Sequence, residues 1–133
     1  MTINQATESG GDLAGAKIVV IDDSGTICRA AKAVLGRVGC AVVTVADGFA
    51  ALAEIIEHRP RLILVDSLMP RLDGYQTCAV IRRNPDFQHT PVVLLTNLDH
   101  HLDRVRGRML GINGYLTKPF TGTELLDTVR RYI

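Results

Sequence analysis

The sequence lacks any apolar run that approaches the ~20 residues a membrane-spanning helix needs. Its first residues, up to about Ala16, are small and polar, without the charged start and apolar stretch of a signal peptide. We therefore expect a cytoplasmic protein with no membrane insertion. Residues 1–15 are predicted to form a flexible tail, and residues 16–133 a single folded domain that works as a stand-alone unit.

An excess of charge of either sign is also missing. The 15 Lys and Arg residues and the 14 Asp and Glu residues are mixed along the chain and give a formal net charge of +1. A protein that binds nucleic acid usually carries a basic stripe that contacts phosphates, so we expect no nucleic-acid partner. Arg104, Arg106 and Arg108 are interpreted as a solvated helix face, with partner binding as the alternative.

Cysteine pairs of the C-x-x-C type and metal-ligand spacings are absent, because the three cysteines are widely separated. We expect Cys28, Cys40 and Cys78 to be small apolar residues of the interior in a reducing compartment. The chain contains neither internal repeats nor low-complexity segments.

What the sequence does contain is an alternation of two patterns. Short continuous runs made almost entirely of apolar residues recur at Ile18–Ile21, Ala41–Val45, Leu62–Val65, Val92–Leu95 and near Tyr115 and Leu116. Strands of this kind are typical of a parallel sheet that is covered on both faces. Between the runs lie segments with helical spacing of apolar residues, including one around Leu98 to Met109 and one from about Tyr75 to Arg83.

The ends of several helices are marked by local signals. Ser24 is a good N-cap and Gly39 a good residue just past the C-terminus of the first helix. Thr121 and Glu124 have the spacing of a capping box at the start of the last helix. Five strands alternating with helices predict an α/β fold, a doubly wound five-stranded parallel sheet with helices on both faces.

Ligands of doubly wound sheets bind at the carboxyl ends of the strands. Five polar residues are expected there: Asp22, Asp23, Asp66, Thr96 and Lys118. Carboxylates that are brought together repel one another, and Mg²⁺, which prefers oxygen ligands, would relieve that repulsion. With the cation and Lys118 beside it, a carboxylate can attack phosphorus, so Asp66 is the candidate nucleophile for phosphoryl transfer.

Each residue also has a plainer interpretation. Asp22 and Asp23 alone are typical turn residues ahead of a helix, and Thr96 alone is a common strand residue. Lys118 alone is an ordinary surface lysine at a turn, and Tyr115 an aromatic residue at the edge of the core. Their combination at one sheet edge is what favours a functional site.

The same residues resemble the receiver-domain family of bacterial two-component response regulators. The resemblance rests on Asp22-Asp23, on Asp66 followed by Met69-Pro70-x-x-Asp73-Gly74, on Thr96, and on Lys118-Pro119-Phe120, and it spans about residues 16–133. It implies a flavodoxin-like strand order of 2-1-3-4-5. It also implies a phosphoacceptor at Asp66 and Mg²⁺ held by Asp22, Asp23, Asp66 and the backbone carbonyl of Leu68.

Further roles follow from the resemblance. Thr96 and Lys118 would contact the phosphoryl group, Tyr115 would act as a rotameric switch, and the Lys118-Pro119 bond in the following turn would be cis. Phosphorylation would then change the face formed by the last two helices and the last strand. The family is a phosphoacceptor signalling family and not an enzyme family in the usual sense, although its members assist their own phosphoryl transfer and hydrolysis.

The resemblance also implies partners: a histidine kinase as phosphodonor and a downstream protein target. Within the family, the segments Met69–Ala79 and Tyr115–Phe120 are most similar to regulators of twitching motility by type IV pili, so the pilus machinery is the expected target.

Residues at three positions bear on how this chain would differ from other members of the family. Asn97 stands where a smaller residue is usual, which would slow acyl transfer or stiffen the switch. Leu68 and Leu98 occupy the positions that flank the path of the attacking water, so we expect slow loss of the phosphoryl group, because a misplaced nucleophile is costly. The alternative is that both leucines turn into the core and leave the path open.

The same residues argue against two other functions and leave one open. A flavin carrier would need a phosphate-binding loop where Asp22 and Asp23 stand, and these aspartates would repel a phosphate. A phosphatase of the aspartyl-phosphate type would need D-x-D after the first strand, whereas these aspartates are adjacent. A receiver-like scaffold that binds partners without phosphorylation is the remaining alternative.

Overall fold

The structure is a computed structural model, and it describes residues 13–97 and 104–133. Strands and helices alternate along the chain as the sequence predicts. The elements are β1 (Lys17–Ile21), α2 (Gly25–Arg37), β2 (Ala41–Val45), α3 (Gly48–His58), β3 (Leu62–Asp66), α4 (Gly74–Arg82), the short 3₁₀ helix η2 (Pro85–Phe87), β4 (Val92–Asn97), α5 (Arg104–Met109), β5 (Gly114–Lys118) and α6 (Gly122–Tyr132).

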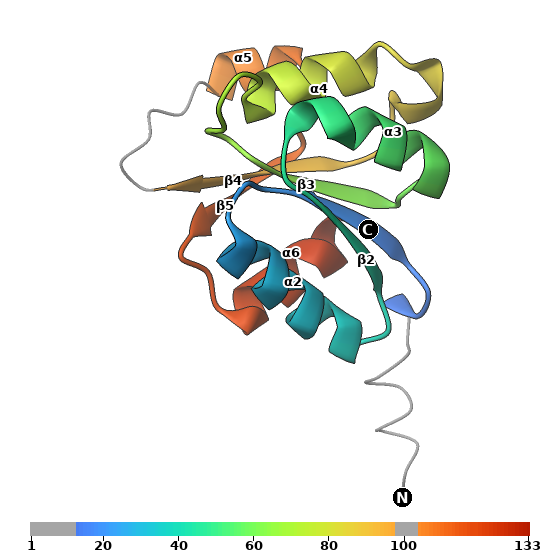
Figure 1. Cartoon of the computed structure of the whole chain (residues 1–133), viewed down its shortest axis with the longest axis vertical. Coiled ribbons are helices and arrows are strands. Elements are labelled where there is room, and N and C mark those ends of the chain that lie inside the picture. Colours follow the sequence, from blue (N-terminus) through green and yellow to red (C-terminus); the bar gives the residue numbers. More distant parts are fainter. Residues whose placement is uncertain (1–12, 98–103) are drawn as a thin grey trace, which may run out of the picture.

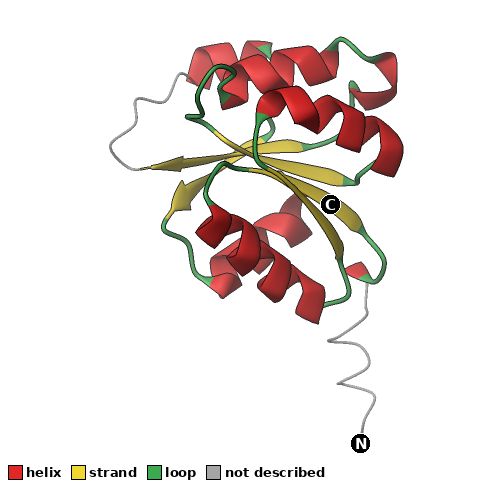
Figure 2. Ribbon diagram, viewed as in Figure 1, coloured by secondary structure: helices red, strands yellow, loops and turns green. Residues whose placement is uncertain are grey.

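The five strands form one parallel sheet in the order β2-β1-β3-β4-β5. Helices α3, α4 and α5 cover one face and α2 and α6 cover the other, with the strands as the middle layer (Figures 1 and 2). The predicted fold class and strand order are therefore confirmed. The predicted turn is confirmed as well, since the Lys118-Pro119 peptide bond is cis.

The side chains of alternate residues in the central strands pack into two separate hydrophobic cores, one on each face of the sheet. Val19, Ile63 and Leu94 point to the side of α3, α4 and α5, whereas Val20 and Leu64 point to the side of α2 and α6. Every residue of β3 is buried, and the four residues before Asp66 are all apolar, as a strand covered on both faces requires.

The edge strand β2 differs from that prediction. Ala41 and Thr44 are exposed and Val42 and Val43 only half-buried. Because β2 pairs with β1 alone, its outer edge has no neighbouring strand whose side chains would cover it. Coverage on both faces was thus correctly predicted for the centre of the sheet and wrongly for this edge.

Helix ends follow their local sequence. The Ser24 hydroxyl accepts a hydrogen bond from the backbone N–H of Ile27 at 3.3 Å, and Gly39 has a φ of +92° just past α2. The Thr121 hydroxyl and the Glu124 carboxylate form the predicted capping box. Helix α4 begins one residue before the predicted Tyr75, because Asp73 and Gln76 cap it in the same reciprocal way.

The folded part begins before residue 16. Leu13 is 1% exposed within the core beneath α2 and α6, and the backbone N–H of Gly15 donates to the carbonyl of Gly39 at 2.9 Å. The predicted flexible tail is therefore wrong for residues 13–15, because an apolar side chain at 13 finds a place in the core. Residues 1–12 lie outside the described part.

Two further expectations have a clear outcome. Cys40 and Cys78 are buried as predicted, but Cys28 is only half-buried. The helix predicted around Leu98 to Met109 is observed as α5 over Arg104–Met109, and its first part lies outside the described residues. Among the helices that the structure describes, none is both long and apolar enough to cross a membrane.

Candidate functional site

Three carboxylates meet at the carboxyl ends of β1 and β3. Asp22 and Asp23 directly follow β1, and Asp66 is the last residue of β3. Ligand oxygens of the three side chains lie within 4.8 Å of one another. Asp22 and Asp66 are 1% and 5% exposed, whereas Asp23 faces solvent. The structure thus brings together the three aspartates that the sequence predicted to converge.

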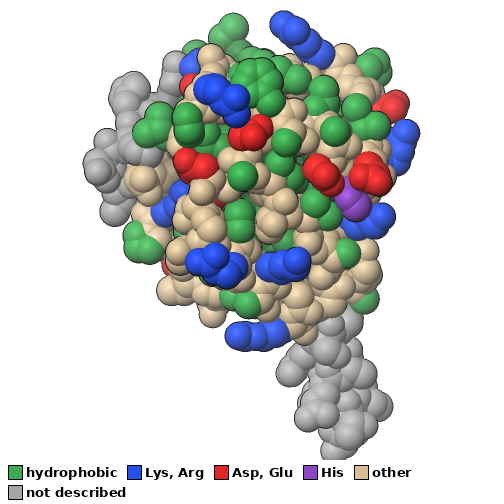
Figure 3. Space-filling view, in the orientation of Figure 1, with side chains coloured by type: hydrophobic (Ala, Val, Ile, Leu, Met, Phe, Trp, Pro, Cys, Tyr) green, Lys and Arg blue, Asp and Glu red, His purple; other side chains and the backbone are tan. Residues whose placement is uncertain are grey.

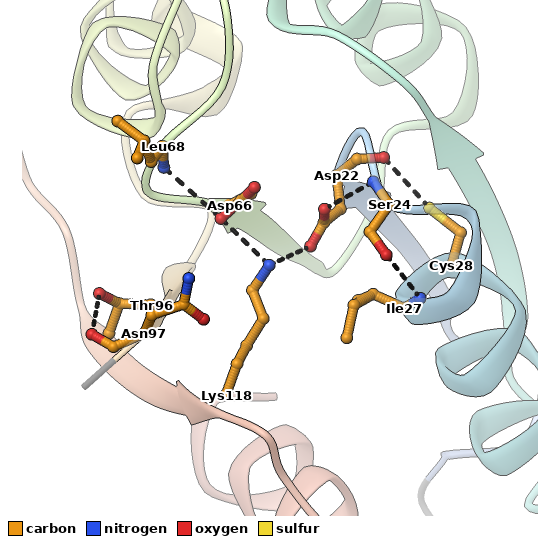
Figure 4. A network of polar contacts seen from close by, with 9 residues as sticks. All are labelled: Asp22, Ser24, Ile27, Cys28, Asp66, Leu68, Thr96, Asn97 and Lys118. Atoms are coloured by element: carbon orange, nitrogen blue, oxygen red, sulfur yellow. Dashed lines mark hydrogen bonds and ion pairs between the residues drawn. The ribbon is translucent and has the colours of Figure 1, made fainter. Parts of the chain in front are cut away.

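Lys118, the last residue of β5, reaches into this group (Figure 4). Its ammonium lies 2.9 Å from Oδ2 of Asp22 and 3.2 Å from Oδ1 of Asp66. The parallel register sets β5 beside β4, with Lys118 opposite Asn97 and two strands away from Asp66. The long lysine stem spans that separation, so Lys118 is no ordinary surface lysine.

The electrostatics of the site are unbalanced. Burial raises the pKa of the Asp66 carboxyl above its ordinary value, and the negative charge of Asp22 raises this pKa further, while Lys118 partly opposes the rise. Burial by itself would lower the pKa of Lys118, but its hydrogen bond and charge interaction with Asp22, and then those with Asp66, leave it raised. One ammonium does not neutralise three carboxylates, and the remaining negative charge favours a further cation.

The donor set fits Mg²⁺. All three side chains offer hard carboxylate oxygens, and the exposure of Asp23 leaves one side open, as a cation that keeps several waters requires. The site is also connected to backbone donors, because the N–H of Leu68 points at Oδ1 of Asp66 at 3.5 Å. The role predicted for the Leu68 carbonyl stays a prediction.

A second group with metal-ligand atoms lies on α3, where Glu54, Glu57 and His58 come together at the surface. His58 lies 3.2 Å from Glu54 and 3.8 Å from Glu57. Basic, acidic and apolar side chains are interspersed over this face of the molecule (Figure 3). Contacts between side chains at the surface contribute little to stability.

Thr96 and Asn97 are the last two residues of β4. Thr96 is 1% exposed, and its hydroxyl donates to the carbonyl oxygen of Asn97 at 3.4 Å. Figure 4 shows this hydroxyl on the far side of the strand end from Asp66. Thr96 is therefore placed near the site, but its hydroxyl is turned away from the Asp66 carboxylate.

Tyr115, on β5, is half-buried and packs against α5. The guanidinium of Arg104 lies 4.7 Å from the centre of its ring. The tyrosine hydroxyl approaches Gly107 so closely that a Cβ at this position would overlap it. This placement is compatible with both interpretations of Tyr115, as an aromatic residue at the edge of the core and as a switch. The switch role stays a prediction.

Leu68 lies in the loop after β3, and 61% of it is exposed. The alternative that this side chain turns into the core is therefore wrong. Leu98, the second residue of the predicted water barrier, lies outside the described residues.

Residues beyond the predicted set support Asp22. The backbone N–H of Ser24 donates to Oδ1 of Asp22 at 2.9 Å, and the Cys28 thiol donates to its carbonyl oxygen at 3.3 Å. Burial and the charge of Asp22 raise the pKa of this thiol. A hollow of about 240 Å³ opens here, lined by Asp22, Asp23, Gly25, Cys28, Thr44, Val45 and Ala46. The sequence signal was present, because Cys28 lies one helical turn after the N-cap Ser24.

Comparison with known proteins agrees with this geometry. The family model described as response regulator receiver domain matches residues 18–130. Protein PilG of Pseudomonas aeruginosa is 50% identical over 119 residues, which cover 90% of this chain and 88% of PilG. A probable transcriptional regulator, ycf27 of Porphyridium aerugineum, is 39% identical over 86% of this chain, but the match spans only 46% of that longer protein.

Solved structures give the same result. The chemotaxis protein CheY4 of Vibrio cholerae superposes with a TM-score of 0.85 at 31% identity, over 90% of this chain and all of CheY4. The receiver domain of the sensor histidine kinase PA1611 of Pseudomonas aeruginosa superposes with a TM-score of 0.80 at 33% identity, over 90% of this chain and 98% of that domain. That structure has a magnesium ion coordinated in its active-site cleft.

Proposed function

This chain belongs to the response regulator receiver domain family, and from that membership we propose that it is a single-domain response regulator that is phosphorylated on Asp66 and signals by docking to other proteins. The observation that carries the proposal is the Lys118 ammonium, which lies between the carboxylates of Asp22 and Asp66. This position of the ammonium supports the proposal, because a phosphoryl group on Asp66 would lie within reach of the same cation.

The chemistry follows from the residues at the site. A carboxylate oxygen of Asp66 attacks the phosphorus of a phosphohistidine on a histidine kinase, a P–O bond forms and the P–N bond breaks, and its electron pair stays on the imidazole. Asp22, Asp23, Asp66 and the Leu68 carbonyl would hold Mg²⁺, which neutralises charge on the phosphoryl oxygens when bound. Lys118 moves from Asp66 to a phosphoryl oxygen, since a phosphorylated carboxylate loses its negative charge on the bonded oxygen.

Incubation with acetyl phosphate and Mg²⁺, followed by intact mass measurement, tests this assignment. We expect one phosphoryl group per chain, none with Asp66→Asn, and normal labelling with the matched variant Asp127→Asn, whose side chain is exposed on α6. Labelling on another residue of the wild-type protein would contradict the assignment. A protein that accepts no phosphoryl group would instead be a phosphorylation-independent scaffold.

The signal is proposed to pass through Thr96 and Tyr115. The Thr96 hydroxyl leaves the Asn97 carbonyl for a phosphoryl oxygen, and the Tyr115 ring fills the vacated space. Coupling of this kind typically changes partner affinity about 5–150-fold. Thr96→Ala should remove the response of the Tyr115 ring signals in NMR spectra to acetyl phosphate while leaving the mass gain at Asp66. An unchanged response would rule out this route.

The output is proposed to be control of twitching motility through the type IV pilus machinery, in the cytoplasm. Identity of 50% to PilG over 90% of the chain supports this assignment. Expression of the chain in a bacterium that lacks its own PilG should restore twitching, and the Asp66→Asn variant should not. Failure of the wild-type chain at normal protein levels would contradict the pilus assignment while leaving the phosphoacceptor chemistry intact.

A further inference from the structure

Helix α3 carries apolar side chains on its outer surface as well as on its inner one. Phe49 is 63% and Ile56 47% exposed, and Ala53 between them is also exposed. Residues four and seven positions apart lie on one side of a helix, so these three form a row, here called the α3 stripe. Ala51 and Ile55, which are buried, lie on the other side of the helix.

The α3 stripe is more than scattered exposed residues. Single apolar side chains are common on protein surfaces, whereas grouped ones often mark a binding surface. Phe49 and Ile56 are two of the five large apolar side chains that are exposed among the described residues. Apolar side chains gather over α3 in the space-filling view (Figure 3). The stripe thus offers an uncovered apolar surface to another molecule.

Charged groups of opposite sign flank the two ends of the stripe. At its N-terminal end, the guanidinium of Arg71 lies 5.3 Å from the centre of the Phe49 ring. The Arg71 side chain is 68% exposed, and its ion pair with Asp47 is long, at 3.7 Å. At the C-terminal end, the Glu57 side chain is 73% exposed and lies 3.8 Å from His58. Both exposed charges are within reach of a partner.

A surface with a cation at one end and an anion at the other is complementary to itself after a two-fold rotation. We propose that the α3 stripe is a homodimer interface in which two α3 helices pack antiparallel. Each Arg71 pairs with Glu57 of the partner subunit, and each Phe49 packs toward Ile56 of the partner subunit. Parallel packing would place like charges opposite each other, so the charges select the antiparallel arrangement.

Ala53 has a special place in this arrangement. It lies at the middle of the stripe, so the two-fold axis passes beside it and Ala53 meets Ala53 of the partner subunit. Packed helices lie about 8–10 Å apart, depending on the side chains at the crossing point. A small residue at the axis lets the two helices approach closely enough for Phe49 and Ile56 to make contact.

The size of the stripe sets the expected affinity. Interfaces that bury less than about 1,200 Å² belong to weak and transient complexes, and exposed ion pairs add little. We therefore expect a dissociation constant on the order of 10 μM. The described residues that line the hollow beside Asp22 include none of the stripe. A dimer of this kind presents two copies of the chain to one target, and a target with two binding sites gains affinity by avidity.

Sedimentation velocity on the full chain, over a concentration series that spans the expected dissociation constant, tests the proposal. The mean mass should rise from one chain to two. Ile56→Asp should remove the dimer, because each substitution in a two-fold interface occurs twice. The matched control is Val105→Asp, at a position on α5 that is 66% exposed, and it should leave the dimer unchanged. Ala53→Glu should abolish the dimer too, and serves if Ile56→Asp misfolds by circular dichroism.

Charge reversal tests the antiparallel arrangement. Arg71→Glu alone and Glu57→Arg alone should each weaken the dimer about 10-fold, since two ion pairs become two repulsions. The two substitutions in one chain should restore it. An equimolar mixture of the two single variants should also restore it, as a heterodimer in which both pairs are attractive. Arg131→Glu, exposed on α6, controls for net charge and should have no effect.

Several results would overturn the proposal. A chain that stays monomeric at every concentration excludes the homodimer and leaves the stripe for a different protein. A dimer that is lost with Val105→Asp but kept with Ile56→Asp uses α5 instead. Failure of the mixed single variants to associate excludes the antiparallel pairing of Arg71 with Glu57. Growth beyond two chains also contradicts it, because a two-fold interface closes at the dimer.

Discussion

Two long basic side chains, Lys118 and Arg82, lie at opposite ends of the sheet and have different kinds of partners. At the carboxyl ends, Lys118 lies among carboxylates whose negative charge it does not balance. At the amino ends, the guanidinium of Arg82 donates to the carbonyl oxygens of Phe87 at 2.6 Å, Thr90 at 2.6 Å and Gly111 at 2.5 Å. A fourth bond, at 3.1 Å, reaches Oδ1 of Asn113.

The difference lies in what each cation can do next. The two Nη atoms of Arg82 donate to fixed neutral acceptors, so this side chain joins the end of α4 to the segments before β4 and β5. Lys118 is a compact charge on a flexible stem and is held by electrostatic attraction, which another anion can redirect. The molecule is therefore fixed at the end away from the chemistry and adjustable at the end where the chemistry is proposed.

The strongest test of this comparison is Arg82→Met. Loss of the donor leaves several carbonyls without a charge-assisted hydrogen bond, each worth about 1–3 kcal/mol, so we expect the free energy of unfolding to fall by about 3 kcal/mol. Urea denaturation measures it. Because Arg82 is remote from the carboxylates, Mg²⁺ should not restore the lost stability, and a restoration would contradict the separation of the two ends.

Lys118→Ala should have the next largest effect, with the opposite response to Mg²⁺. Without the ammonium, Asp22 and Asp66 face each other uncompensated, and we expect a loss of about 2 kcal/mol in EDTA, less than for a fully buried pair because the cleft is open to solvent. Added Mg²⁺ should recover much of that loss. Denaturation of wild type and variant with and without Mg²⁺ measures both effects.

Asn113→Ala probes a single acceptor of the Arg82 network. Oδ1 of Asn113 accepts from Arg82 and also, at 2.8 Å, from the backbone N–H at the start of β4. Removing it leaves that N–H unpaired, and we expect a loss of about 1–2 kcal/mol. Hydrogen exchange at Val92 should become faster. Unchanged exchange would show that the side chain is not what protects this amide.

The smallest expected change is a gain. Asp66→Asn should raise the free energy of unfolding in EDTA at neutral pH by on the order of 1 kcal/mol, since it removes a buried carboxylate that Asp22 repels. The folded-state pKa of Asp66 is raised, so its ionisation costs stability as the pH rises through that pKa. The advantage of the variant should therefore fade as pH falls through the raised pKa and vanish below the ordinary carboxyl value.

A matched measurement on Asp127→Asn, exposed on α6, controls for the loss of a charge. The free energy of unfolding of this variant should differ little from that of the wild type over the same pH range. If both variants gain equally, the gain comes from net charge and not from the crowded site.

The sequence alone determined most of the architecture, because strands and caps are local. Wholly apolar runs produced β1, β3 and β4, and Ser24 and Thr121 started their helices as their side chains dictate. The convergence of Asp22, Asp23 and Asp66 followed as well, since parallel strands bring their carboxyl ends to one edge.

Only the tertiary structure decided the contacts of Lys118 and Arg82, the two basic side chains at opposite ends of the sheet. Lys118 meets Asp22 across 96 residues, and Arg82 reaches Gly111 across 29, so no local pattern contains either pair. The same holds for Arg104 on Tyr115, which depends on the close approach of α5 at Gly107. A residue's own sequence neighbourhood sets its backbone, but the partner of a long charged side chain is fixed only when the sheet and helices have packed.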